Sequence, residues 1–277
     1  MESLVLPAAA AILLFGLLVG WVLVRSWRPS RSRRAPTDVP ATWRPLIEDR
    51  VPLARKLTAE EWDRLLWLVR GFVREKNFEG IDGLAITEEI KVIVAAQACV
   101  LLLHLDTGPF PRVRSIILYP GTFVPRAPLL DRHVRVEPER EPAPLLGESL
   151  RGVIVLSWES VQQSAVEPRD GHNVVLHEFA HELDQEDGYV DGIPLLEAPQ
   201  STRVWARVLR ERFEELQRQT KDGESDLLNA YGATNRAEFF AVATELFFER
   251  PVEMRERYPD LYSELKGFYR QDPAERA

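Results

Sequence analysis

The feature that most constrains this chain is a histidine pair in its middle, within the run HEFAHELD. His177, Glu178 and His181 have the spacing HExxH. A helix turns by about 100° per residue, so positions i and i+4 lie on one face, one turn apart. Two imidazoles on one face can reach a single metal ion, and the glutamate then borders the open coordination position. The spacing is typical of metal-assisted hydrolysis of an amide bond.

The residues around this motif favour a helix over a loop. Asn173 is a suitable N-cap, and Val175, Phe179 and Leu183 repeat at i, i+4 and i+8, which makes one face apolar. Gly188 follows as a helix stop signal. The alternative is an ordinary helix with two surface histidines. Because the chain has only 5 His, chance would produce the spacing in roughly one such sequence in a hundred, and we prefer the metal site.

A catalytic zinc site needs a third protein ligand besides the two histidines. The remaining histidines are weak candidates. His104 lies in an apolar run, which predicts a satisfied histidine in the core, and His133 lies in a proline-rich polar stretch, which predicts a solvated one. His172 precedes the helix and indicates no particular neighbour.

A carboxylate downstream is the better candidate for the third ligand. Glu238 lies in the first turn of a predicted helix within the apolar segment 231–248. An ionised carboxylate beside a core is costly unless it is paired or binds a metal. Two alternatives stay open at this point. Glu238 also fits the N3 partner of an N-cap at Asn235, and Glu245, seven residues on, is a possible ligand by spacing alone.

The runs HEFAHELD and YGATNRAEFF resemble the zinc peptidases of the Mlc titration factor A family and, more distantly, the catalytic domain of anthrax lethal factor. The runs KNFEG, AAQAC, YPGTF and GESLRGVIVLSW agree with the former family, and the similarity covers about residues 50–265. The resemblance implies a zincin-like metallopeptidase with one Zn²⁺ per chain, held by His177, His181 and Glu238. It implies Glu178 as the general base and Tyr231 as the phenol that meets the developing oxyanion.

The chemistry expected from such a ligand set is hydrolysis of a peptide or protein substrate. Zinc lowers the pKa of a bound water from about 16 toward about 7. Glu178 would take the proton and later deliver it to the leaving amine. Tyr231 would donate a hydrogen bond to the tetrahedral oxygen.

A carboxylate is also expected to orient a ligand histidine through its second ring nitrogen. Asp184, three residues after His181, is the candidate for this role. Asp187 and Asp191 follow in the stretch DGYVDG, where a solvated acidic loop is the preferred interpretation.

The N-terminal residues predict a membrane anchor. Residues 4–24 carry no charge, and about 20 apolar residues are enough to cross the hydrocarbon layer as a helix. A cleavable signal peptide would have a basic start and a shorter apolar run. Five arginines that follow the span predict that this side stays in the cytoplasm: Arg25, Arg28, Arg31, Arg33 and Arg34. We therefore predict an anchor at 1–25, a linker rich in Arg, Pro and Ser at 26–45, and a metallopeptidase domain at 46–277 on the cytoplasmic face.

The charge balance argues against a nucleic-acid partner. The chain has a net charge of −8. Residues 1–34 contain five Arg and one Glu, a net charge of +4, so the remainder carries −12. Binding to phosphates draws on basic surface, which an acidic body lacks.

Hydrophobic periodicity predicts an α+β fold. We expect helices at 58–76, 87–105 and 202–219, a closing pair of helices within 252–269, and strands at 115–119 and 152–158. Strands gathered in the middle with helices at both ends are typical of the α+β class. The strand at 152–158 is either a sheet edge that pairs with an extended peptide or an interior strand, and its unbroken apolar run favours the second.

Two functions from different classes fit these observations. The main hypothesis is a membrane-anchored zinc metallopeptidase, with an aminopeptidase-like activity linked to regulation as one form of it. The alternative, implied by the resemblance, is a regulatory protein that sequesters a transcription factor or another partner with little proteolysis. The intact base and ligands favour retained chemistry. A purely structural zinc site would usually include several cysteines, whereas Cys99 is the only cysteine.

Overall fold

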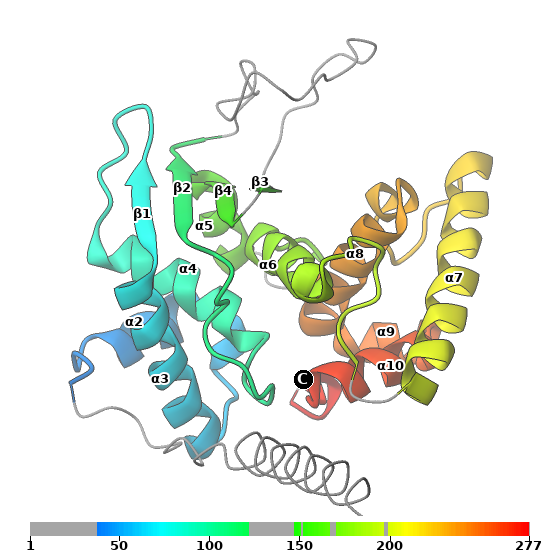
Figure 1. Cartoon of the computed structure of the whole chain (residues 1–277), viewed down its shortest axis with the longest axis horizontal. Coiled ribbons are helices and arrows are strands. Elements are labelled where there is room, and N and C mark those ends of the chain that lie inside the picture. Colours follow the sequence, from blue (N-terminus) through cyan, green and yellow to red (C-terminus); the bar gives the residue numbers. More distant parts are fainter. Residues whose placement is uncertain (1–37, 122–146, 151, 167–169, 197–198, 277) are drawn as a thin grey trace, which may run out of the picture. The chain divides into compact units, whose positions relative to one another are not determined.

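The computed structural model describes residues 38–121, 147–150, 152–166, 170–196 and 199–276. The chain divides into two units, residues 1–34 and 35–277. All described residues belong to the second unit, and Figure 1 shows their helices and strands. The predicted boundaries of an anchor and a linker fall largely outside the described residues, and the three-part division stays a prediction.

Helices open the described part of the chain: α2 (Trp43–Arg50), α3 (Ala59–Glu75) and α4 (Glu88–Val100). Helix α3 begins with a capping box, in which the Thr58 side chain accepts from the backbone of Glu61 and the Glu61 side chain accepts in return. Helix α4 packs against α3 and is buried over most of its length. Both helices predicted for this region are therefore confirmed, although the second ends earlier than expected.

A small sheet follows, with the strands β1 (Asn77–Gly80), β2 (Ser115–Tyr119), β3 (Gly147–Leu150) and β4 (Val153–Ser157). Their order is β1-β2-β4-β3; β1 and β2 are parallel, β2 and β4 are parallel, and β3 is antiparallel to β4. Ile116 pairs with Ile154 and Leu118 with Leu156, and all four side chains are fully buried. Strand β4 is thus interior, as preferred above, and cannot pair with a peptide as an edge.

The second half of this unit is helical: α5 (Trp158–Val166), α6 (Val174–Asp184), α7 (Pro199–Asp222), α8 (Arg236–Glu249), α9 (Pro251–Arg257) and α10 (Pro259–Tyr269). Helix α8 packs against both α6 and α7 and lies between them in Figure 1. Every residue of α8 except Arg236 and Glu238 is buried. The mixed composition with a small sheet confirms the predicted combination of α and β structure.

Helix α6 is held from its apolar side by aromatic rings. Phe179 lies 4.5 Å from Phe110 and 5.6 Å from Phe72 between ring centroids. Ring pairs at such distances stabilise a core beyond their buried area. Lys76 donates a hydrogen bond to the carbonyl of Phe110 at 2.8 Å. The histidines therefore lie on the opposite face of α6 from these aromatic rings.

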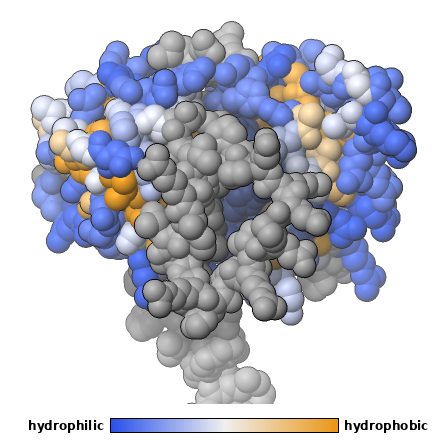
Figure 2. Space-filling view, turned by 90° about the horizontal axis from the view of Figure 1, so that it is seen from above, coloured by the Kyte–Doolittle hydropathy of each residue, from blue (hydrophilic) through white to orange (hydrophobic). Residues whose placement is uncertain are grey.

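The coloured surface of this unit is mainly hydrophilic on the face shown in Figure 2, with smaller hydrophobic areas between the hydrophilic ones. Apart from Tyr231, the large apolar side chains that stay exposed in the described part of the chain lie in the connection between α6 and α7 and near the start of α7: Tyr189, Val190, Leu195 and Val204.

The single-pass membrane location predicted from residues 4–24 must be corrected. Within the part of the chain that the structure describes, no helix is long and apolar enough to cross a membrane. Helix α7 is long, with 24 residues, but charges recur along it, and the apolar helix α4 has only 13 residues; a span needs about 20 apolar residues. Residues 4–24 themselves lie outside the described part, and we do not retain the predicted location.

Candidate functional site

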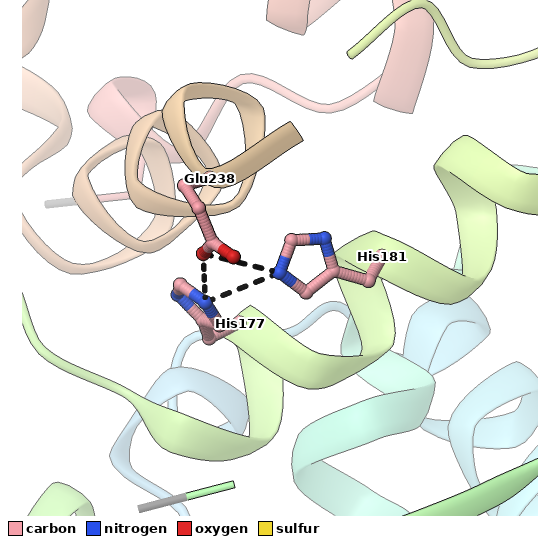
Figure 3. A group of neighbouring side chains, drawn as sticks. All are labelled: His177, His181 and Glu238. Carbon is pink, nitrogen blue, oxygen red and sulfur yellow. Dashed lines mark hydrogen bonds and ion pairs between the residues drawn. The ribbon is translucent and has the colours of Figure 1, made fainter. Parts of the chain in front are cut away.

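The histidine motif lies on helix α6 as the spacing predicts. The Asn173 side chain accepts hydrogen bonds from the backbone N–H groups of Val175 and Leu176 at 3.1 and 3.0 Å, so α6 starts at its predicted N-cap. His177 and His181 lie one turn apart on this helix, with their ring centroids 4.9 Å apart. Both rings point toward α8 in Figure 3.

Glu238 reaches the two histidines from the start of α8. Asn235 caps α8 by accepting from the backbone N–H of Glu238 at 3.0 Å, which places Glu238 in the first turn. The Glu238 carboxylate lies against both imidazoles in Figure 3. Its position at the capped helix start and its position beside the histidines are therefore compatible, because the cap uses its backbone and the histidines meet its side chain.

The distances in this cluster fit a tetrahedral zinc ion. Nε2 of His177 is 3.0 Å from Oε2 of Glu238 and 3.3 Å from Nε2 of His181, which is 3.3 Å from the same carboxylate oxygen. Tetrahedral ligands about 2.0–2.1 Å from zinc lie about 3.3–3.4 Å apart. The three side chains keep 12–17% of their surface exposed, so solvent can reach the centre. Within the described residues, this is the group that could hold a metal ion.

The electrostatics of the cluster favour an ionised carboxylate. Burial opposes the charge of Glu238, but hydrogen bonds to His177 and His181 outweigh it and lower the pKa of Glu238 to about 2. Burial also works against a charged His177, and its hydrogen bonds to Glu238 and Glu245 raise the pKa of His177 well above the usual range. The carboxylate and the imidazoles thus favour a positive charge between them, as the ligands of a metal ion do.

Glu178 lies beside this centre and is buried, with 4% of its surface exposed. Burial raises the pKa of Glu178 to about 7, although the neighbouring charges of His177 and His181 work in the opposite direction. A general base is most effective when its pKa lies near the working pH. The position and the pKa of Glu178 suit proton transfer.

Tyr231 lies beside the ring of His177. Asn229 accepts from the backbone N–H of Tyr231 at 2.8 Å and starts the 3-10 turn Ala230–Ala233. The Tyr231 ring is 5.9 Å from that of His177, and 51% of the residue is exposed. Burial, followed by the charges of Glu238 and Glu178, raises the pKa of Tyr231, which keeps the phenol protonated as a hydrogen-bond donor.

Comparison with known proteins agrees with this geometry. Residues 24–270 match the family described as glucose-regulated metallo-peptidase M90. The chain belongs to the M90 metallopeptidase family. The prediction of a likeness to Mlc titration factor A is therefore confirmed, whereas the more distant likeness to anthrax lethal factor stays a prediction.

Three similar proteins align with 82–97% of the chain. The Mlc titration factor A of Edwardsiella ictaluri is 32% identical over 232 residues, 82% of this chain and 86% of the relative. The protein of the same name from Serratia proteamaculans is 30% identical over 252 residues, 90% and 94% of the two chains. The "Uncharacterized protein slr2042" of Synechocystis sp. is 32% identical over 275 residues, 97% and 98% of the two chains.

Asp184 does not contact a ligand histidine in the way the sequence analysis predicted. Its Oδ2 accepts from the backbone N–H of Gly192 at 3.0 Å, and its Oδ1 is buried with no hydrogen-bond partner among the described residues. Burial raises the pKa of Asp184 to about 6. The carboxylate anchors the connection to α7, and no hydrogen bond joins it to His181 in the described part of the chain.

The other acidic and histidine candidates are not among the side chains that could share a metal ion in the described part of the chain. Asp187 and Asp191 accept from backbone N–H groups of their own exposed loop, which agrees with a solvated loop. His104 bonds to Glu61 at 2.9 Å; its ring is satisfied as predicted, but it lies at the surface rather than in the core. The ring of His172 lies beside Asn229, and His133 lies outside the described residues.

Glu245 is the residue whose place beside the histidines the sequence left unresolved. Its Oε1 lies 2.7 Å from Nδ1 of His177, the ring nitrogen that faces away from Glu238. The signal was its position two turns after Glu238, which puts both side chains on one face of α8. Spacing alone could not tell a ligand from a partner of the second nitrogen.

Proposed function

We propose that this chain hydrolyses peptide bonds with a zinc ion held by His177, His181 and Glu238, and that Glu178 is the general base. The observation that carries the proposal is the convergence of two imidazole nitrogens and one carboxylate oxygen at 3.0–3.3 Å, with Glu178 on the same helix. A ligand set of two histidines and a glutamate leaves the fourth position of zinc open, which a structural site would not.

The mechanism assigns one task to each residue. When bound, zinc supplies a Lewis acid that polarises the scissile carbonyl and lowers the pKa of water. Glu178 accepts the proton of the attacking water and then transfers it to the nitrogen of the leaving amine. Tyr231 donates its phenol hydrogen to the carbonyl oxygen as negative charge develops there. These roles are those of a zincin-like peptidase that combines HExxH with a distant glutamate.

A regulatory binding protein is the second candidate function. The relatives named Mlc titration factor A carry a name that refers to the titration of Mlc, and this name favours a regulatory partner. The two functions differ in what they require of Glu178, because binding a partner needs no base beside the metal. Peptidase activity that depends on Glu178 therefore separates them.

The test compares the full chain with its Glu178→Gln variant. Metal analysis by mass spectrometry is expected to give one zinc per chain in both proteins, because the introduced amide has nearly the same shape as the carboxylate and no ligand is removed. A panel of chromogenic peptides is expected to show a loss of about 10²–10⁴-fold in the variant. Peptides with free and with blocked N-termini distinguish aminopeptidase from endopeptidase action. Stoichiometric zinc with equal cleavage, or with none, in the two proteins would reject the proposal and favour the binding function.

A further inference from the structure

Glu245 connects the metal-binding face of α6 to the start of that helix. Its Oε1 is 2.7 Å from Nδ1 of His177, and its Oε2 accepts from the backbone N–H of Asn173 at 2.6 Å. Glu245 is buried on α8, with 5% of its surface exposed. We propose that Glu245 is a positioning residue, which holds the His177 ring in the orientation and tautomer that bind the metal. This inference rests on the proposed function of the same site.

The tautomer follows from the two neighbours of the His177 ring. Nε2 faces Glu238 and His181, where the metal ligands converge. A nitrogen that binds a metal carries no hydrogen, so the hydrogen of a neutral ring must reside on Nδ1. Glu245 accepts that hydrogen. A histidine held in this way loses less rotational freedom when the metal binds, and it is a stronger electron donor to the metal.

The role requires a carboxylate rather than an amide. Each oxygen of Glu245 faces a nitrogen that carries hydrogen, one on His177 and one in the backbone of Asn173. A carboxylate accepts with both oxygens, whereas an amide has one acceptor and one donor end. Glu245→Gln therefore leaves one of the two N–H groups facing another donor. The change hardly alters the side-chain volume, so packing is preserved.

The competing explanation is that Glu245 only fastens the start of α6. Glu249 does so one turn later on α8: its Oε1 accepts from Nδ2 of Asn173 at 3.1 Å, and its Oε2 accepts from the backbone N–H of Gly171 at 3.2 Å. Glu249 has the same 5% exposure, but no hydrogen bond joins it to a proposed ligand in the described residues. Glu249→Gln is thus a matched control, because it also removes one acceptor from the segment that precedes α6.

The experiment measures zinc affinity of the full-length wild type, Glu245→Gln and Glu249→Gln by competition with a chromogenic chelator. We expect Glu245→Gln to bind zinc about 10–100-fold more weakly and Glu249→Gln to match the wild type. The absorption spectrum of the Co²⁺-loaded proteins is expected to change only in Glu245→Gln, because the ligand field depends on the orientation of His177. Equal affinities in the two variants, whether both weakened or both unchanged, would overturn the inference.

A measurement on the wild type keeps the test decisive if Glu245→Gln does not fold. In the zinc-loaded protein, a long-range ¹H–¹⁵N spectrum is expected to show the His177 hydrogen on Nδ1, shifted downfield by its bond to Glu245. A hydrogen on Nε2 instead would overturn the inference. A wild type that binds no zinc would reject the proposed function itself, whereas normal zinc binding with the wrong tautomer would reject only the role of Glu245.

Discussion

Asn173 is the residue through which the stability of the metal-binding helix is best tested. Its side chain caps α6 with two hydrogen bonds and donates a third, buried one to Glu249 at 3.1 Å. Replacing an N-cap asparagine by alanine costs about 1 kcal/mol. Leaving the buried Glu249 oxygen without its donor costs about 1–3 kcal/mol more. We therefore expect Asn173→Ala to lower the free energy of unfolding by about 3 kcal/mol.

The matched control is the asparagine that caps α8. Asn235 begins α8 with one hydrogen bond to the backbone of Glu238 and is exposed. Asn235→Ala is expected to cost only about 1 kcal/mol, the typical value of a cap. Asn173→Ser keeps a good cap and loses the bond to Glu249, so its expected cost is about 1–3 kcal/mol.

Urea unfolding of the metal-free proteins, followed by circular dichroism, measures these differences. Metal-free protein is required because Asn235 precedes a proposed ligand, and bound zinc would add its own stabilisation to the folded state. Equal m-values would show that the variants expose the same surface on unfolding. A loss in Asn173→Ala no larger than that in Asn235→Ala would refute the reasoning that burial and the bond to Glu249 strengthen the first cap.

Three further predictions concern acidity and backbone shape. kcat/KM is expected to fall at low pH with an apparent pKa between 4.5 and about 7, because Glu178 must be ionised to act as a base. Burial raises the pKa of Glu178, and a bound cation opposes that rise. Zinc occupancy measured at each pH separates this effect from metal loss, and a kcat/KM that increases as the pH falls would contradict the prediction. In urea unfolding, Gly192→Ala should lower the free energy of unfolding more than Gly188→Ala. Both glycines have a positive φ, but only a Cβ at Gly192 would lie 2.5 Å from the carbonyl oxygen of Arg236. Equal losses of stability in the two variants would contradict this prediction. Burial raises the pKa of Glu249 from 4.5 to about 9, so between these pH values the folded state keeps a proton that the unfolded state releases. The free energy of unfolding should therefore fall as the pH rises through this window, by up to about 1.4 kcal/mol per pH unit. The melting temperature of Glu249→Gln should change less with pH than that of the wild type, and an equal change would argue against a buried neutral acid.

The predicted membrane location depended on a local sequence pattern alone. Residues 4–24 are long and apolar enough to predict a span, and the arginines after them predict its orientation. Both statements concern residues outside the described part, and the helices within it include none that could cross a membrane. The family match begins at residue 24, so the peptidase assignment does not depend on this segment.

The sequence by itself determined the parts of the site that lie within one helix. The period of an α-helix brings His177 and His181 to one face, and a capping residue such as Asn173 acts on backbone groups two and three positions away. The same short-range logic places Asn235 before α8. These features depend on separations of a few residues, which local geometry specifies.

Only the tertiary structure decided which carboxylates serve the histidines. Glu238 and Glu245 lie on the same face of α8, and nothing local separates a metal ligand from a partner of Nδ1. The rotation and depth with which α8 packs against α6 place Glu238 at Nε2 of His177 and Glu245 at Nδ1. Likewise, Asp184 was close to His181 in sequence but bonds to Gly192. These choices depend on contacts between residues far apart in the chain, or on the path of a loop, and they follow from how the whole core packs.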